Sequence, residues 1–259
     1  MAWPLRVPAL VAVAFLAIPL LGLLMRAPWR GLPLILSDAG VLDALRLSLV
    51  CATSAAIVSL VLGVPLAWLL ARSRSRLAPL LRALVTLPLV LPPVVGGVAL
   101  LLAFGRDGMA GQWLDRWFAV TLPFSTAGVV MAETFVAMPF LVLAVEGAFR
   151  AADEGFEEAA ATLGASRLVV FRRVSLPLVA PSVLGGTVLA WARALGEFGA
   201  TITFAGNVPG RTQTMPLAVY LAMESDPQAA IALSLVLLGV SLAVLAGLRG
   251  RWLPGVRPT

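Results

Sequence analysis

The longest polar stretch within the chain, residues 150–175, reads RAADEGFEEAAATLGASRLVVFRRVS. It separates two apolar runs, 126–149 and 179–204, each of which is long enough to cross a bilayer as a helix. A simple connection between two such helices needs only a few residues. We therefore expect this stretch to fold into a structure of its own and to fit into a groove of a partner protein.

Two short helices with a glycine between them are predicted within this stretch. Asp153 is a suitable N-cap for the first helix, because the glutamates that follow it lie near the positive end of the helix dipole. Gly164 suits a left-handed residue that stops this helix. Ser166 can cap a second helix that runs through Phe171 and ends before Pro177. The apolar side chains expected to be exposed are Phe156, Leu163, Leu168 and Phe171.

The composition of the whole chain is that of a membrane protein. Of its 259 residues, 60% are hydrophobic and 12% are charged, whereas a soluble domain carries about 25% charged residues. We expect an all-α integral membrane protein with about six transmembrane helices, in a single membrane domain over residues 1–259. Its first helix would cover about 7–25, its core about 41–248, and its cytoplasmic loop about 150–177. The six apolar segments are 7–25, 47–71, 83–104, 126–149, 179–204 and 229–248.

The distribution of arginine predicts the orientation of these helices. With the N-terminus inside the cell, the inner segments contain twelve arginines and the outer segments six. Cytoplasmic loops of membrane proteins carry an excess of positive charge. We therefore expect a multi-pass protein of the cell membrane with both termini in the cytoplasm.

The composition also argues against several kinds of site. All nineteen cationic residues are arginine and lie in short segments between apolar runs, which is not the basic stripe of a nucleic-acid-binding domain. There is no histidine, and the single cysteine, Cys51, has no second cysteine to pair with. No Gly-x-x-x-x-Gly-Lys-Ser/Thr phosphate loop and no Ser/His/Asp set occurs. We expect no catalytic residue, metal site or cofactor in this chain, and a buried, inert Cys51.

One pair of charges falls inside an apolar run. Arg193 lies sixteen residues after Pro177, about 24 Å along a helix that starts at the inner face. Glu197 follows four residues later, so the two side chains can pair on one helix face. One interpretation is a structural ion pair; the other is that Arg193 offers positive potential to an anion at an outer gate. In the second case Arg193, Glu197 and Thr201 would belong to the permeation pathway.

The polar stretch resembles a known motif. Glu158-Ala159-Ala160, three residues, Gly164, nine residues and then Val174-Ser175-Leu176-Pro177 resemble the EAA loop of permeases in binding-protein-dependent ABC importers, with Val174 where the family usually has Ile. The resemblance implies a type I importer fold in which this loop is the cytoplasmic coupling helix that sits in a cleft of the ATPase. The residues that it assigns to ATPase coupling are Glu158, Ala159, Ala160, Gly164, Ser166, Phe171, Leu176 and Pro177.

A second stretch is similar to the molybdate permease family. Residues 193–201, 204–207 and 211–220 carry this likeness, and the run RTQTMPLAVY at 211–220 favours molybdate permeases over their sulfate relatives. The resemblance implies a homodimer, two cytoplasmic ATPase subunits that use ATP and Mg²⁺, and an extracytoplasmic oxyanion-binding protein. The chain itself would be a non-catalytic permease for molybdate, or for tungstate.

Two alternatives remain open from the sequence. A sulfate or thiosulfate permease shares part of the same motifs. A secondary transporter driven by an ion gradient, or a channel, belongs to a different class, and such proteins usually carry acidic groups deep in the membrane. The candidates for such coupling groups are Glu133, Glu146, Arg193 and Glu197. Glu133 and Glu146 are both expected to approach an interface, because they lie toward the ends of their run.

Overall fold

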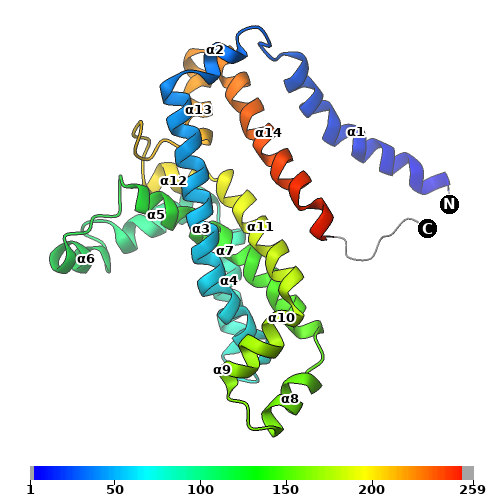
Figure 1. Cartoon of the computed structure of the whole chain (residues 1–259). Coiled ribbons are helices and arrows are strands. Elements are labelled where there is room, and N and C mark those ends of the chain that lie inside the picture. Colours follow the sequence, from blue (N-terminus) through cyan, green and yellow to red (C-terminus); the bar gives the residue numbers. More distant parts are fainter. Residues whose placement is uncertain (1–2, 253–259) are drawn as a thin grey trace.

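The computed structural model describes residues 3–252, and every regular element in that range is helical (Figure 1). The elements are α1 (Trp3–Met25), α2 (Leu32–Leu36), α3 (Ala39–Arg72), α4 (Ala78–Val90), α5 (Pro93–Phe104), α6 (Gly111–Phe118), α7 (Thr126–Ala151), α8 (Gly155–Thr162), α9 (Arg167–Val170), the π-helical segment η1 (Phe171–Ser175), α10 (Leu176–Leu178), α11 (Ala180–Leu195), α12 (Gly199–Phe204), α13 (Met215–Ser225) and α14 (Pro227–Trp252).

Four helices, α1, α3, α7 and α14, are individually long and apolar enough to cross a membrane. Two further candidates are bent: α4 meets α5 at 119°, and the helix formed by α9, η1 and α10 meets α11 at 78°. If each bent pair is one span, the total is six, in agreement with the all-α expectation. Continuous helices over 83–104 and 179–204 are not observed, because the first breaks at Leu91–Pro92 and the second ends at Leu195 before α12 begins.

Proline explains both bends. The hexapeptides LPLVLP (87–92) and LPLVAP (176–181) lie at the two breaks. Proline lacks an N–H and its ring clashes with the preceding helical turn. Pro92 and Pro93 occupy the N-cap and first position of α5, and Pro181 lies in the first turn of α11. Pro177 is accommodated in α10 directly after η1, where the Leu176 amide donates to the Phe171 carbonyl five residues back.

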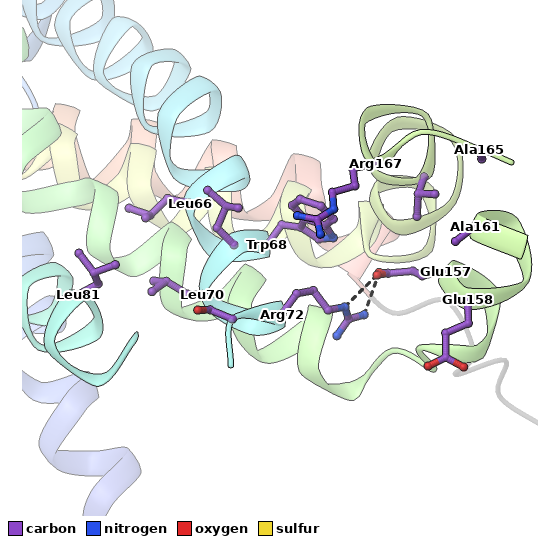
Figure 2. Close-up of a pocket in the computed structure, with 13 residues that line it drawn as sticks. Leu66, Trp68, Leu70, Arg72, Leu81, Glu157, Glu158, Ala161, Ala165 and Arg167 are labelled. Atoms are coloured by element: carbon purple, nitrogen blue, oxygen red, sulfur yellow. Dashed lines mark hydrogen bonds and ion pairs between the residues drawn. The ribbon is translucent and has the colours of Figure 1, made fainter. Parts of the chain in front are cut away.

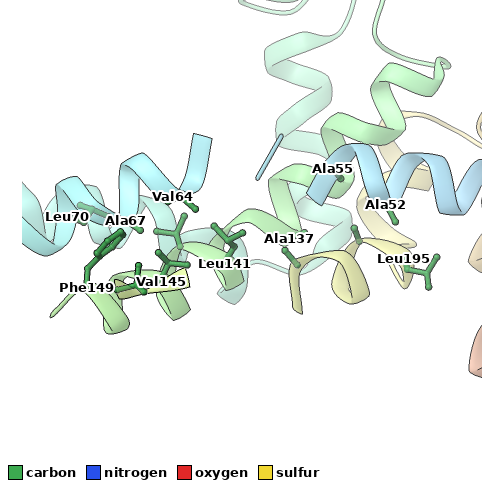
Figure 3. Close-up of a cluster of buried hydrophobic side chains, with 14 residues drawn as sticks. Ala52, Ala55, Val64, Ala67, Leu70, Ala137, Leu141, Val145, Phe149 and Leu195 are labelled. Carbon is green, nitrogen blue, oxygen red and sulfur yellow. The ribbon is translucent and has the colours of Figure 1, made fainter. Parts of the chain in front are cut away.

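The buried core lies between α3, α7 and α11 (Figure 3). Small residues on α3 allow close packing, because a Cβ atom on Gly63 would lie only 2.9 Å from a methyl group of Leu141. Ala52, Ala55 and Ala67 on the same helix are fully buried. Cys51 is also fully buried and free, as expected.

The two ends of this core carry different elements. In Figure 1, α8 and α9 lie at one end of α3, and α2 and α13 lie at the other. α1 lies beside α14, away from the core, and none of the side chains in its apolar window is buried within the chain. The helix pair α8–α9 is therefore presented at one end of the bundle, with α7 and α10 leading into and out of it.

Candidate functional site

The polar stretch forms the predicted helix–glycine turn–helix. α8 ends in a left-handed Gly164 (φ +86°), as expected. The Gly164 amide donates to the Ala161 carbonyl (3.0 Å) and the Ala165 amide to the Ala160 carbonyl (3.1 Å). This pair of hydrogen bonds is the Schellman arrangement, which satisfies carbonyl groups at the helix end. The turn is thus fixed by its backbone, and α9 starts from a defined direction.

Three details of the expected helix pair are wrong. Asp153 does not cap α8; its Oδ1 accepts from the Gly155 amide (2.9 Å), in a turn before the helix, and Glu154 occupies the N-cap position. Ser166 occupies the N-cap position of α9, but its side chain makes no capping hydrogen bond. The second helix does not end before Pro177, because η1 continues it to Leu178.

One face of the helix pair is exposed and partly apolar. Glu158 and Ala159 are exposed, and Ala160 is half-buried. Phe156, Leu163 and Leu168 are 57%, 89% and 63% exposed, as expected. Large apolar side chains that remain exposed outside the apolar spans are typical of a protein-binding surface.

Phe171 does not belong to that face. Its ring packs against Trp68 of α3 (5.2 Å between centroids) and Phe149 of α7 (6.5 Å). Leu176 is half-buried against the core, and Pro177 is exposed. Phe171 and Leu176 therefore fasten the helix pair to the bundle instead of facing a partner.

Arg72, the last residue of α3, connects α8 to the ends of two long helices. It makes a bidentate ion pair with Glu157 of α8, with Nε 3.0 Å from Oε2 and Nη2 2.9 Å from Oε1 (Figure 2). Its Nη1 donates to the Phe149 carbonyl at the end of α7 (2.8 Å) and to Glu154 Oε1 (3.3 Å). The side chains of Arg72 and Glu157 are each 14% exposed, so the pair is shielded from water.

The Glu157 carboxyl is held in its charged form. Burial raises its pKa, but the hydrogen bonds and positive charge of Arg72 outweigh this effect and leave the pKa below its usual value. Because the pKa of Glu157 is lower in the folded state than in the unfolded state, the ion pair stabilises the fold fully at any pH above the ordinary pKa of a glutamate. Its contribution is lost only as the pH falls through the lowered pKa.

A second ion-pair cluster lies close by, where α4 meets α7. Glu146 Oε1 accepts from Nε of Arg82 (2.7 Å) and from Nε of Arg150 (3.0 Å). Nη2 of Arg82 also donates to the Leu70 carbonyl near the end of α3 (3.3 Å). Glu146, which was expected to approach an interface, is thus a buried link between α4, α7 and α3.

A cavity of about 570 Å³ lies between the ends of α3 and α4 and the helix pair (Figure 2). Its apolar wall is formed by α3 and α4, including Leu66, Leu69 and Leu81. Its polar wall contains two arginines and two glutamates, of which Arg72 and Glu157 are already paired. This balance of charge gives the cavity no preference for an anion.

The expected pathway residues lie at the other candidate site, the break between α11 and α12. Arg193 Nη2 lies 2.5 Å from Glu197 Oε2, so the predicted pair forms. However, Glu197 lies in the turn after α11, and its Oε1 accepts from the Ala200 amide (2.9 Å) at the start of α12. The estimated 24 Å from Pro177 does not apply either, because the helix bends by 78° before α11. Thr201 is fully buried on α12.

Glu133 of α7 is buried as well, at 1% exposure. Among the residues that the structure describes, its Oε2 has no hydrogen-bond partner. Within the chain, the Glu133 side chain is therefore surrounded by protein.

Sequence reasoning missed Arg72, Glu157 and Arg82 as site residues. The Glu146–Arg150 contact could have been found from its spacing of four. The contacts of Arg72 and Arg82 with glutamates join residues 64 to 85 positions apart, and no local pattern indicates them.

Comparisons with known proteins agree with this architecture. Residues 63–253 match the family "Binding-protein-dependent transport system inner membrane component". The chain is 49% identical over 244 residues to the Molybdenum transport system permease protein ModB of Mycobacterium tuberculosis, covering 94% of this chain and 92% of the relative. It is 36% identical to the Sulfate transport system permease protein CysT of Salmonella typhimurium, covering 89% and 84%.

The fold is also found among solved structures. A bacterial ABC transporter involved in the import of the acidic polysaccharide alginate superposes with a TM-score of 0.76 at 18% identity, covering 96% of this chain and 94% of that one. At this identity the likeness shows the fold of an ABC importer permease. The chain is a multi-pass inner membrane protein and belongs to the family of inner membrane components of binding-protein-dependent transport systems, together with the molybdenum transport permeases.

Proposed function

We propose that this chain is the permease subunit of an ABC importer that moves molybdate across the cytoplasmic membrane by alternating access. The observation that carries the coupling role is the exposed helix pair α8–α9, which presents Glu158 and Ala159 at one end of the bundle. Its spacing from Glu158 to Pro177 is that of the EAA loop. The 49% identity to a molybdenum transport permease over almost the whole chain supports the substrate.

In this proposal two copies of the chain form the membrane part, and two ATPase subunits bind below it. ATP and Mg²⁺ are used by the ATPase subunits, while α8 fits into a cleft on each of them. An extracytoplasmic oxyanion-binding protein delivers the substrate from the other face. This arrangement places α8, α9 and both termini in the cytoplasm, which agrees with the excess of arginine in the inner segments.

The Arg193–Glu197 pair supports a structural role better than direct anion binding. Its positive charge is already matched by the buried Glu197 carboxylate, and the same carboxylate holds the first turn of α12. The pair thus fixes the break beside Thr201, which we assign to the wall of the pathway. Selection among oxyanions then falls mainly on the binding protein.

The proposal is tested with the assembled complex in proteoliposomes. We expect that binding protein loaded with molybdate or tungstate stimulates ATP hydrolysis and uptake, that sulfate-loaded protein does little, and that vanadate abolishes uptake. Equal stimulation by sulfate would move the chain to the sulfate permeases. Uptake driven by an ion gradient without ATP would contradict the ABC importer.

A further inference from the structure

We propose that Arg72 is a positioning residue that holds the coupling helix α8 to the ends of α3 and α7, so that movements of α8 reach the bundle through this ion pair. The inference rests on the proposed function, because it gives α8 its coupling role. It adds a noncovalent connection to the two peptide connections of the helix pair.

The first argument is that α8 has little packing of its own. None of its residues is buried. Its connection to α7 is the short non-helical segment before Gly155, and its connection to α9 is the left-handed turn at Gly164. Apolar burial, which fixes most helices in proteins, is therefore not what fixes α8.

The second argument is the geometry of the guanidinium group. Arg72 uses three nitrogens at once, toward Glu157, the Phe149 carbonyl and Glu154. These partners belong to α8, to the end of α7 and to the segment between the two helices. A planar, multidentate donor sets both distance and orientation, whereas a lysine would supply only a point charge.

The third argument is that this contact is separate from the one that anchors α9 and η1. Phe171 is held by Trp68 and Phe149 through ring packing, independently of any charge. Loss of the Arg72 ion pair should therefore release α8 and leave the rest of the helix pair in place. The variants needed for a test can be expected to fold.

The experiment uses the full complex of permease, ATPase and binding protein in proteoliposomes. The variants are Arg72→Glu, Glu157→Arg, the two together, and Arg72→Lys. Arg74→Glu is the matched control, since Arg74 is exposed two residues away and makes no ion pair within the described part of the chain. We measure molybdate transported per ATP hydrolysed and the amount of ATPase that co-purifies.

Each single charge reversal should lower the transport-to-ATP ratio about tenfold, an effect within the usual range of coupling between sites. The double reversal should recover part of it, because it restores the pairing with position 157 but a glutamate at position 72 cannot donate to the Phe149 carbonyl. Arg72→Lys should be intermediate, and Arg74→Glu should match the parent. The inference would be supported equally if the single variants lost the co-purifying ATPase and the double reversal regained it. Unchanged ratios in the single variants, or a double reversal that restores neither measure, would overturn it.

A second readout separates this inference from the proposed substrate. Spin labels at Ala161→Cys in α8 and Leu69→Cys in α3 report the distance between the two helices. Neither side chain is a hydrogen-bond partner of Arg72, so the labels leave the ion pair in place. In the parent we expect a narrow distance distribution that ATP does not change; in Arg72→Glu we expect a broad one. A parent complex that fails to import molybdate but shows this result would contradict the substrate and leave the role of Arg72 intact. An equally narrow distribution in Arg72→Glu would contradict the role.

Discussion

The α8–α9 end of the bundle and the α11–α12 break both depend on buried charges, but they use them differently. At the α8–α9 end, Arg72 and Arg82 join residues that are far apart in the sequence, and the shielded carboxylates of Glu157 and Glu146 are both paired. At the break, Arg193 and Glu197 are near neighbours, while Glu133 and Thr201 keep buried oxygens without a partner among the described residues. One end is held together across four helices, and the other stabilises only its own turn.

This difference has a physical consequence. Buried ion pairs with every group satisfied make an assembly of helices rigid, whereas unsatisfied polar groups are costly and mark places where contacts can change. A rigid α8–α9 end suits the transmission of a movement, and a polar, incompletely paired break suits a pathway that opens and closes. Four variants test this contrast.

Glu146→Ala should have the strongest effect on stability. Glu146 is 5% exposed and is shared by Arg82 and Arg150, so its removal leaves a partly buried arginine unpaired. Removing one partner of a buried pair costs about 3 kcal/mol or more, reduced here because Arg82 is partly exposed. We expect a fall of about 2 kcal/mol in the free energy of unfolding in detergent. The exposed Glu158→Ala is the control, and equal stability of the two variants would show that the cluster is not structural.

Gly164→Val should impair coupling more than stability. A β-branched residue is strained at φ +86°, by about 1–2 kcal/mol, although no described atom crowds the position. Gly164→Asn is the matched control, since asparagine tolerates left-handed backbone. We expect binding-protein-stimulated ATPase activity to fall in the valine variant and to persist in the asparagine variant. Normal coupling with valine would mean that the Gly164 turn does not position α8 for the ATPase.

Glu197→Gln separates the charge of the break from its hydrogen bond. A glutamine oxygen can still accept from the Ala200 amide, whereas Glu197→Leu loses both functions. We expect Glu197→Gln to lose less stability than Glu197→Leu, by about 1 kcal/mol, the typical value of a capping interaction. The double reversal Arg193→Glu with Glu197→Arg should restore only part of the parent's transport, because an arginine cannot accept that hydrogen bond. Full transport by this reversed protein would show that the hydrogen bond from the Ala200 amide is not essential.

Glu133→Gln should have the smallest effect. Arg193 is paired with Glu197, and within the described residues Glu133 forms no ion pair that the substitution could break. Glutamine also has nearly the same volume as glutamate. We expect transport within about twofold of the parent and unfolding stability within about 0.5 kcal/mol. A loss of transport above tenfold with normal assembly would instead give Glu133 a direct role in the pathway.

The sequence predicted what depends on composition and on local backbone rules. The apolar runs indicated the membrane helices, and Gly164 indicated the left-handed turn, because a glycine after an alanine-rich helix is a local signal. The apolar run over 83–104 indicated a span but not its 119° bend, which follows from Pro92 and Pro93 at the break between α4 and α5. The site was only half predicted: the exposed face of α8 follows from its motif, whereas the partner of Arg72 depends on how α3 and α7 pack.

The bend between α4 and α5 also determines which surroundings, lipid, water or protein, can lie against this part of the surface. In an uninterrupted helix the carbonyl oxygens of Pro88 and Leu89 would accept from residues 92 and 93, but both are proline and have no N–H to give. Acyl chains offer no donor either, and an unsatisfied backbone group in hydrocarbon costs several kcal/mol. Pro92 and Pro93 are exposed at the surface of the chain. The carbonyl groups of Pro88 and Leu89 must therefore be hydrated or covered by protein, so the surface of this helical bundle is not uniformly lipophilic.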